Sequence, residues 1–225
     1  MIKDLAFLYL DLPKFPVTED LILRLKKIVN EEGNFKDNFR NCRHIPIYVT
    51  EGNNIENKNE IKKQWSKQSE QLPEVRSYIE NNILPWSKYL GRIVIICTKP
   101  KEYNPTHIDC GRKNFDNNTL EHKFRVVING QTNNLYFNGK NKNHYISENL
   151  KNHPFIMSGC WPHTMENNDN DIKFTLAMGS PWDADDSNKE YKDLISDSYI
   201  KYKNSYISKK DMKMPKYIDN YFSKK

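Results

Sequence analysis

Apolar residues in the first third of the chain recur mainly at the spacing of an amphipathic helix. After Thr18, a favourable N-cap residue, the apolar residues at positions 21, 25, 28 and 29 share one face of a helix and predict one such helix. Short, continuous apolar runs beside the helices predict buried strands. Helices are predicted over 18–31, 60–69 and 73–83, and buried strands over 5–10 and 45–49.

From about residue 92 the pattern changes to short runs of β-branched and aromatic residues. These runs are evenly spaced and separated by turn pairs such as Asn129-Gly130 and Asn138-Gly139. Strands are predicted over 92–97, 104–110, 122–128, 134–138, 143–147, 154–157, 161–166 and 172–178. Such spacing is typical of a sandwich, barrel or jelly roll, so we expect an α+β chain with a double-sheet core.

Composition and charge narrow the function only slightly. Apolar residues make up 37% of the 225 residues and aromatic ones 12%, which is enough for a folded core. The net charge is +6, but Lys and Asn are spread along the chain rather than gathered in one block. A scattered excess of this size argues against nucleic acid as the main partner.

The four cysteines do not indicate a zinc knuckle or a thioredoxin-type redox site. Cys42, Cys97, Cys110 and Cys160 form no CxxC motif. The apolar run near the N-terminus is too short for a signal peptide, and no stretch is long enough to span a bilayer. We therefore expect a cytoplasmic protein with reduced thiols and no membrane partner.

The residues that point to chemistry lie between positions 105 and 182. His107 and Asp109 are two apart in PTHIDC, and residues at this spacing on a strand point to the same face. They can reach one metal ion together, and His163 can supply a third ligand from a later predicted strand. Two histidines and one carboxylate form the facial triad of non-haem iron(II) oxygenases. A His-x-Asp pair alone is a weak signal, because a chain with six histidines often contains one by chance.

Basic residues on two other predicted strands add to this pattern. Lys173 lies ten residues after His163 and shares a strand face with Thr175, so the pair suits a bound carboxylate; an ordinary edge lysine is the alternative. Arg125 lies inside the apolar strand HKFRVVING, where a charge is costly unless it is paired. A bound carboxylate and an acidic side chain of the chain itself are equally suitable partners.

Four short segments together resemble the iron(II)- and 2-oxoglutarate-dependent oxygenases with a double-stranded β-helix (jelly-roll, cupin-like) core. They are HID at 107–109, Arg125 in its FR strand, WPH at 161–163 and KFT at 173–175. In that family a His-x-Asp motif is followed by a distal histidine and, about ten residues on, by a basic residue and a hydroxyl residue. The most similar branch is that of the aspartyl/asparaginyl β-hydroxylases and cis-proline hydroxylases.

The resemblance covers about residues 85–182, and residues 183–225 match nothing in the family. It implies one oxygenase domain over 1–182, with helical support in about 1–91 and the β-helix core in about 92–182. A polar C-terminal extension, with a helix predicted over 188–207, would follow this domain.

The resemblance also implies the cofactors and the residues that hold them. Iron(II), 2-oxoglutarate and O2 are the expected cofactor and cosubstrates. His107, Asp109 and His163 would bind the metal and form the catalytic centre. Lys173 would hold the distal carboxylate of 2-oxoglutarate, assisted by Arg125 and Thr175. Lys173 stands where this branch more often has arginine, and the presence of Asp109, which aspartyl hydroxylases can lack, favours the proline-hydroxylase side.

The substrate is expected to be a free or peptide-borne amino acid that is hydroxylated at an unactivated C–H, as the resemblance implies. Candidates for contact with it are Trp161, Tyr136, Tyr103 and Arg112, although a solvated loop charge is the better-supported interpretation of Arg112. One alternative is a non-catalytic cupin-like barrel that binds a metal or ligand, although the His-x-His pair usual in cupins is absent. The second alternative is an oxygenase that acts on nucleic acid.

Overall fold

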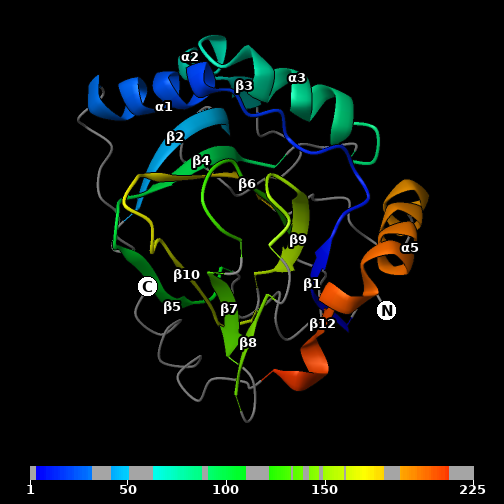
Figure 1. Cartoon of the computed structure of the whole chain (residues 1–225). Helices are drawn as coiled ribbons and strands as arrows, with labels where there is room; N and C mark the ends of the chain where they lie inside the picture. The colour runs from blue at the N-terminus through cyan, green and yellow to red at the C-terminus, as the bar shows by residue number, and fades with distance from the viewer. Residues whose placement is uncertain are drawn as a thin grey trace.

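The computed structural model describes residues 4–31, 42–50, 63–87, 91–109, 122–132, 134–138, 142–146, 149–159, 161–179 and 188–212. Within these ranges the strands form two antiparallel sheets, and the helices lie on the outer side of the larger one (Figure 1). The architecture is therefore a β core with helices added around it.

The larger sheet contains eight strands. In spatial order they are β12 (Ile207–Ser208), β1 (Leu5–Tyr9), β9 (Pro154–Ser158), β6 (His122–Val127), β11 (Lys173–Met178), β4 (Ile93–Thr98), β2 (Cys42–Thr50) and β3 (Lys63–Trp65). The smaller sheet contains β5 (Tyr103–His107), β10 (His163–Glu166), β7 (Leu135–Asn138) and β8 (Asn143–Tyr145).

The chain passes back and forth between the two sheets from β4 to β11. Strands β4, β6, β9 and β11 lie in the larger sheet, and the strands between them, β5, β7, β8 and β10, lie in the smaller one. This winding is that of a double-stranded β-helix, as the sequence predicted. The first 91 residues supply strands as well as helices, because β1, β2 and β3 extend the larger sheet on its two sides.

The helices cover the larger sheet on its outer face. They are α1 (Glu19–Glu31), α2 (Lys67–Glu70), α3 (Pro73–Asn82) and α5 (Lys189–Tyr202), with short 3-10 helices η2 (Lys203–Ser205) and η3 (Lys209–Asp211). The hydroxyl of Thr18 accepts a hydrogen bond of 3.1 Å from the N–H of Leu21, which caps α1 as predicted. None of the helices in the described ranges is long and apolar enough to cross a membrane.

The predicted helix over 60–69 is wrong in part. Residues 63–65 form strand β3, where Trp65 pairs with Tyr48 of β2 and their ring centroids lie 5.0 Å apart. Only one helical turn, α2, follows, and the hydroxyl of Ser66 accepts from the N–H of Ser69 at its start. A partner strand that is distant in the sequence overrides the weak local helical pattern here.

Two hydrophobic clusters lie on the two faces of the larger sheet. The outer cluster joins α1, α3 and α5 to the sheet, and it includes Tyr191 and Ile195 of α5. The C-terminal helix therefore packs on its own chain. The inner cluster lies between the sheets and includes Val127 of β6 and Phe137 of β7. The predicted helix over 188–207 ends earlier, at Tyr202, because the chain then turns to pair β12 with β1.

Candidate active site

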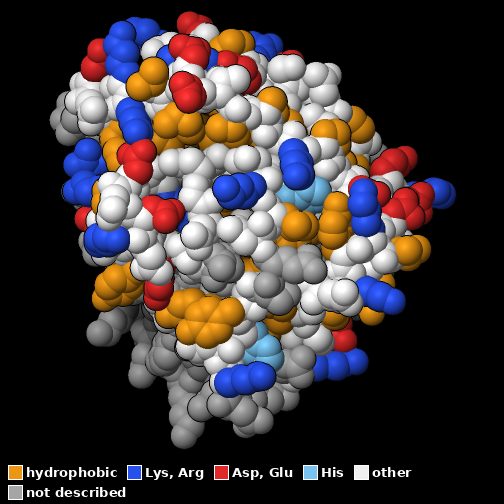
Figure 2. All heavy atoms as spheres, viewed as in Figure 1, with side chains coloured by type: hydrophobic (Ala, Val, Ile, Leu, Met, Phe, Trp, Pro, Cys, Tyr) orange, Lys and Arg blue, Asp and Glu red, His pale blue; other side chains and the backbone are white. Residues whose placement is uncertain are grey.

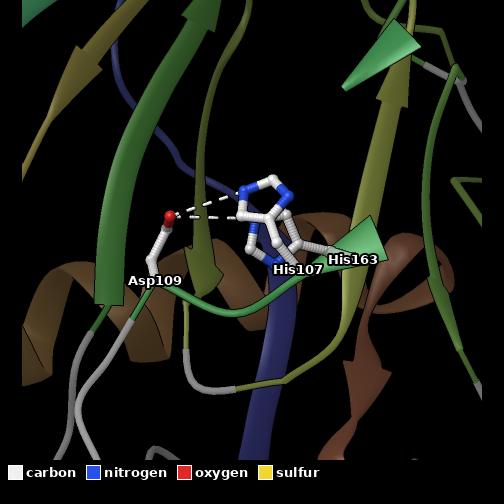
Figure 3. A group of neighbouring side chains, drawn as sticks. All are labelled: His107, Asp109 and His163. Atoms are coloured by element: carbon white, nitrogen blue, oxygen red, sulfur yellow. Dashed lines mark ion pairs between the residues drawn. The ribbon is translucent and has the colours of Figure 1, made fainter. Parts of the chain in front are cut away.

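Two neighbouring strands of the smaller sheet bring the two predicted histidine ligands together. His107 is the last residue of β5 and His163 the first of β10, and they pair directly across the two strands. Their ring centroids are 4.4 Å apart. Asp109 lies just beyond the end of β5 rather than on it, and its N–H donates a hydrogen bond of 2.7 Å to the carbonyl of Gly159. Figure 3 shows the three side chains pointing toward one another.

The distances within this group suit a metal ion after small movements. Nε2 of His107 lies 3.5 Å from Oδ1 of Asp109, and Nε2 of His163 lies 3.7 Å from Oδ2. Each residue offers one ligand atom, and these atoms all lie within 4.8 Å of one another. Ligand atoms on adjacent positions of a metal with bonds of about 2.1 Å are about 3 Å apart, so a shift of about 1 Å closes the site.

The surroundings of His163 prepare one ring nitrogen for a metal. Its Nδ1 lies 2.8 Å from the carbonyl oxygen of Trp161, and a carbonyl can only accept, so Nδ1 carries the proton. Nε2 then presents a lone pair on the side of Asp109. Burial, together with His107, lowers the pKa of His163 to about 3, so the ring is neutral at physiological pH, as a metal ligand must be.

Asp109 is held in the ionised state. Burial alone would raise its pKa, but the hydrogen bond from His107 and the charges of His163, Lys123 and Arg125 outweigh burial and hold the pKa well below its usual range. We attribute this direction mainly to Lys123 and Arg125, which are cations at neutral pH. A neutral imidazole and a carboxylate therefore face each other in the forms that iron(II) binds.

Arg125 has an acidic partner within the chain. Its Nη2 lies 3.6 Å from Oδ2 of Asp109, and Nη1 donates to the carbonyls of Phe124 and Met178 at 3.0 and 3.1 Å. The buried charge is thus paired with an acidic side chain, and that side chain is the proposed metal ligand. Arg125 can orient Asp109 and still present positive charge beside the metal position.

The three ligands open on a cavity of about 260 Å³ between the two sheets. A register shift between β5 and β10 lets Asn104 and His107, three residues apart, both line it. Its described lining residues are His44, Arg92, Val94, Ile96, Asn104, His107, Asp109, Lys123, Arg125, Leu135, Met157, His163, Met165, Ala177 and Gly179. A cavity of this size has room for a small group beside the cluster.

Three basic or titratable residues of this lining were missed from the sequence. Lys123 lies two residues before Arg125, so strand periodicity could have placed both on the same inner face. Arg92 directly precedes β4, and His44 lies on β2; which strands neighbour these two depends on the order of strands in the sheet. No local signal in the sequence places them at the cavity.

Lys173 and Thr175 lie on the predicted strand but not among the described residues that line the cavity. The ammonium group of Lys173 donates to the carbonyls of Gln131 and Glu166 at 2.6 and 3.1 Å. Burial lowers the pKa of Lys173 to about 8. The hydroxyl of Thr175 lies 3.8 Å from the sulfur of Met165, which does line the cavity. Met165 therefore contacts both the cavity and Thr175.

The predicted substrate contacts are not gathered at the cavity. Tyr103 is 57% exposed, and Tyr136 stacks on Tyr145 with ring centroids 4.9 Å apart. Tyr136 lies between buried Leu135 and Phe137, so strand alternation turns it to the outer face. Trp161 is partly buried and acts through its carbonyl on His163. Arg112 lies outside the described residues, as do Cys110 and Cys160.

Comparison with known proteins gives structural likeness only. No protein-family model and no curated protein matches the chain. A prolyl hydroxylase from Trichoplax adhaerens, solved with a hypoxia inducible factor peptide, is 10% identical, with a TM-score of 0.46, over 79% of this chain and 83% of that one. A 2OG-Fe(II) oxygenase family member from Burkholderia pseudomallei is 10% identical, with a TM-score of 0.41, over 69% and 76%. A Pseudomonas putida prolyl-4-hydroxylase is 13% identical, with a TM-score of 0.39, over 77% and 92%.

Proposed function

We propose that this chain is an iron(II)- and 2-oxoglutarate-dependent oxygenase that hydroxylates an unactivated C–H of a free or peptide-borne amino acid. The observation that carries the proposal is the convergence of His107, Asp109 and His163 at the end of a jelly-roll cavity, in protonation states suited to metal binding. Two imidazole nitrogens and one carboxylate are the ligand set that iron(II) takes in oxygenases of this kind.

The side chains around the metal position would divide the work as follows. His107, Asp109 and His163 hold the ion, and the carbonyl of Trp161 fixes the ring of His163. Arg125 orients Asp109 and offers positive charge to a carboxylate bound beside the metal. Iron(II) bound here with 2-oxoglutarate and O2 would supply the oxidising chemistry, and the chain positions the target C–H.

We further propose that Lys173, with Thr175, anchors the distal carboxylate of 2-oxoglutarate. Ala177 lines the cavity, and Thr175 and Lys173 lie on the same strand face, about 7 and about 13 Å further along β11. The cosubstrate can lie along this strand only if the side chain of Met165 moves aside. Methionine is suited to such a movement, because its unbranched side chain has three rotatable bonds.

One observation favours a second candidate, a cupin-like barrel that binds a metal without oxygenase activity. The ammonium of Lys173 already donates to two backbone carbonyls, and Met165 lies against Thr175 on the same strand. In this second candidate Lys173 would be a structural residue and no 2-oxoglutarate would bind.

Nucleic acid as the substrate has less support. Figure 2 shows that, on the face drawn, the coloured lysine and arginine side chains are scattered among acidic ones rather than gathered in a single patch. Phosphate backbones are normally bound by a continuous basic surface.

The experiment that separates these candidates is the conversion of 2-oxoglutarate to succinate. We expect slow, iron-dependent succinate release without substrate and faster release when a substrate amino acid or peptide is present. His163→Ala should abolish both rates, whereas His144→Ala, at a partly buried histidine of β8 outside the described cavity lining, should change neither. Iron binding without any succinate would support the cupin-like barrel instead.

A further inference from the structure

The charges around the cavity are unevenly distributed. Among the described lining residues, Arg92, Lys123 and Arg125 are cations, and Asp109 is the one carboxylate. Arg125 is buried, Lys123 is partly buried and Arg92 is exposed. The three cations therefore extend from the metal position to the outside of the molecule.

The proposed metal and cosubstrate do not balance these charges. A divalent metal and the three cations bring five positive charges, and Asp109 with the carboxylate of the cosubstrate beside the metal brings two negative ones; the distal carboxylate is balanced by Lys173. Among the described lining residues, three positive charges are therefore left before the substrate enters. Positive charge enclosed by low-dielectric walls attracts anions, and burying it without a partner is costly.

The other two cations, Lys123 and Arg92, lie on the larger sheet beside the cavity. Lys123 lies two residues before Arg125 on β6, and its aliphatic stem packs where a side chain at Gly159 would stand. Arg92 directly precedes β4, and its carbonyl accepts a hydrogen bond of 2.8 Å from the N–H of Gly179. That bond ties the backbone of Arg92 to the end of β11, so its position at the cavity is set by the sheet.

From this we infer that the prime substrate carries a carboxylate that binds between Arg92 and Lys123 while its target C–H lies beside the metal. This inference rests on the proposed function, of which it specifies the substrate class. A cavity of about 260 Å³ is below the roughly 300–1,000 Å³ of pockets for drug-sized ligands, so the group that enters it is small. An acidic amino acid, or the free carboxylate of an amino acid, meets both requirements.

The test compares a carboxylate with its neutral amide on the protein loaded anaerobically with iron(II) and 2-oxoglutarate. Propionate and propionamide are titrated at constant ionic strength, and binding is measured by calorimetry and by perturbation of the visible band of the iron complex. Because a hydrogen bond to a charged group contributes about 1.5–3 kcal/mol, propionate should bind at least about 10-fold more tightly than propionamide.

Variants assign this preference to the two cations. Arg92→Gln and Lys123→Met should each remove most of the preference for propionate. Lys189→Met, which removes an exposed charge from α5, should leave it unchanged. Where Lys123→Met disturbs the iron complex through its neighbour Asp109, the Arg92→Gln result alone decides.

Four outcomes have distinct meanings. Equal binding of acid and amide, or binding of neither while the iron complex forms normally, overturns the inference. So does a preference for propionate that survives the loss of both cations. Tighter binding of methyl phosphate and of a short single-stranded oligonucleotide than of propionate would replace the carboxylate by a nucleic-acid phosphate. Failure of the iron complex itself to form in the unmodified protein would instead contradict the proposed function.

Discussion

The two ends of the barrel interior hold polar groups in opposite ways. At the metal end, the carboxylate of Asp109 lies 3.5 Å from His107 and 3.7 Å from His163, and the three side chains are ready to close around an ion. At the other end, Lys173 already makes two hydrogen bonds to backbone carbonyls, at 2.6 and 3.1 Å. The first end is prepared for a ligand, and the second must rearrange to accept one.

This difference separates two parts of the proposed function. Metal binding follows from groups that are in place, so it should withstand any change at Lys173. Cosubstrate binding depends on displacing Met165 and redirecting the Lys173 ammonium, so it should depend on both ends. Changes at one end and at the other should therefore have different consequences.

The largest effect is expected at the metal end. Asp109→Asn keeps the shape of the side chain but removes the negative charge that offsets the ion. Mutation of a residue that only supports a metal ligand typically lowers metal affinity about 10- to 100-fold. Loss of the charge of a ligand itself should therefore weaken iron(II) binding by at least about 100-fold. Calorimetric titration measures this. Asp193→Asn on α5, where the side chain is 56% exposed, is the matched control and should bind iron normally.

A second effect tests how closely the backbone fits around Asp109. A Cβ at Gly159 would stand 2.9 Å from the Cβ of Asp109 and 2.7 Å from the Cε of Lys123. Gly159→Ala should therefore displace Asp109 and weaken iron(II) binding by about 10-fold or more. Gly179→Ala is the control, because its nearest neighbour, the carbonyl oxygen of Arg92, lies at an ordinary 3.5 Å. Equal affinities for the two variants would contradict this account of the metal end.

A third effect belongs to the other end. Lys173→Ala should raise the apparent KM for 2-oxoglutarate by about 10-fold, because a charge-assisted hydrogen bond of about 1.5–3 kcal/mol is lost. Iron(II) affinity should stay the same. Lys173→Arg, which keeps the charge, should recover most of the cosubstrate affinity. An unchanged KM in Lys173→Ala would transfer the anchoring role to Arg125.

The smallest effect is a dependence on pH. With a pKa of about 8, Lys173 is charged below this value and loses its charge as the pH rises through it. The apparent KM for 2-oxoglutarate should therefore rise about twofold between pH 7 and 8, and about fourfold by pH 8.5. Steady-state kinetics at constant ionic strength measures the rise. It should be absent from Lys173→Arg, because a guanidinium stays charged throughout this range.

Candidate site residues that belong to a recognisable sequence motif were found from the sequence. Those that reach the cavity only through the order of strands were missed. His107, Asp109, His163 and Arg125 were found from spacing and resemblance, and the structure brings them together. Arg92 and His44 were missed, because their place at the cavity depends on which strands are neighbours in the larger sheet. Long-range pairing of this kind leaves no periodic mark on the chain.

The same reason explains the errors in secondary structure. Most strands from β4 to β11 were predicted to within two or three residues, since alternation and turn pairs are local signals. Strand β3 was predicted as helix because it is a strand only through its pairing with β2, which is not adjacent to it in the sequence. Asp109 was expected on its strand, but β5 ends at His107, and the backbone of Asp109 bonds instead to Gly159 after β9.

The central claim is that one site binds iron(II) through His107, Asp109 and His163 and then chelates 2-oxoglutarate on that iron. Anaerobic titration of the protein with iron(II), followed by 2-oxoglutarate, tests it most directly. The account predicts that one equivalent of iron binds and that the cosubstrate produces a weak visible charge-transfer band, both lost in Asp109→Asn. Iron that fails to bind, or that binds and gives no band with saturating 2-oxoglutarate, would contradict it.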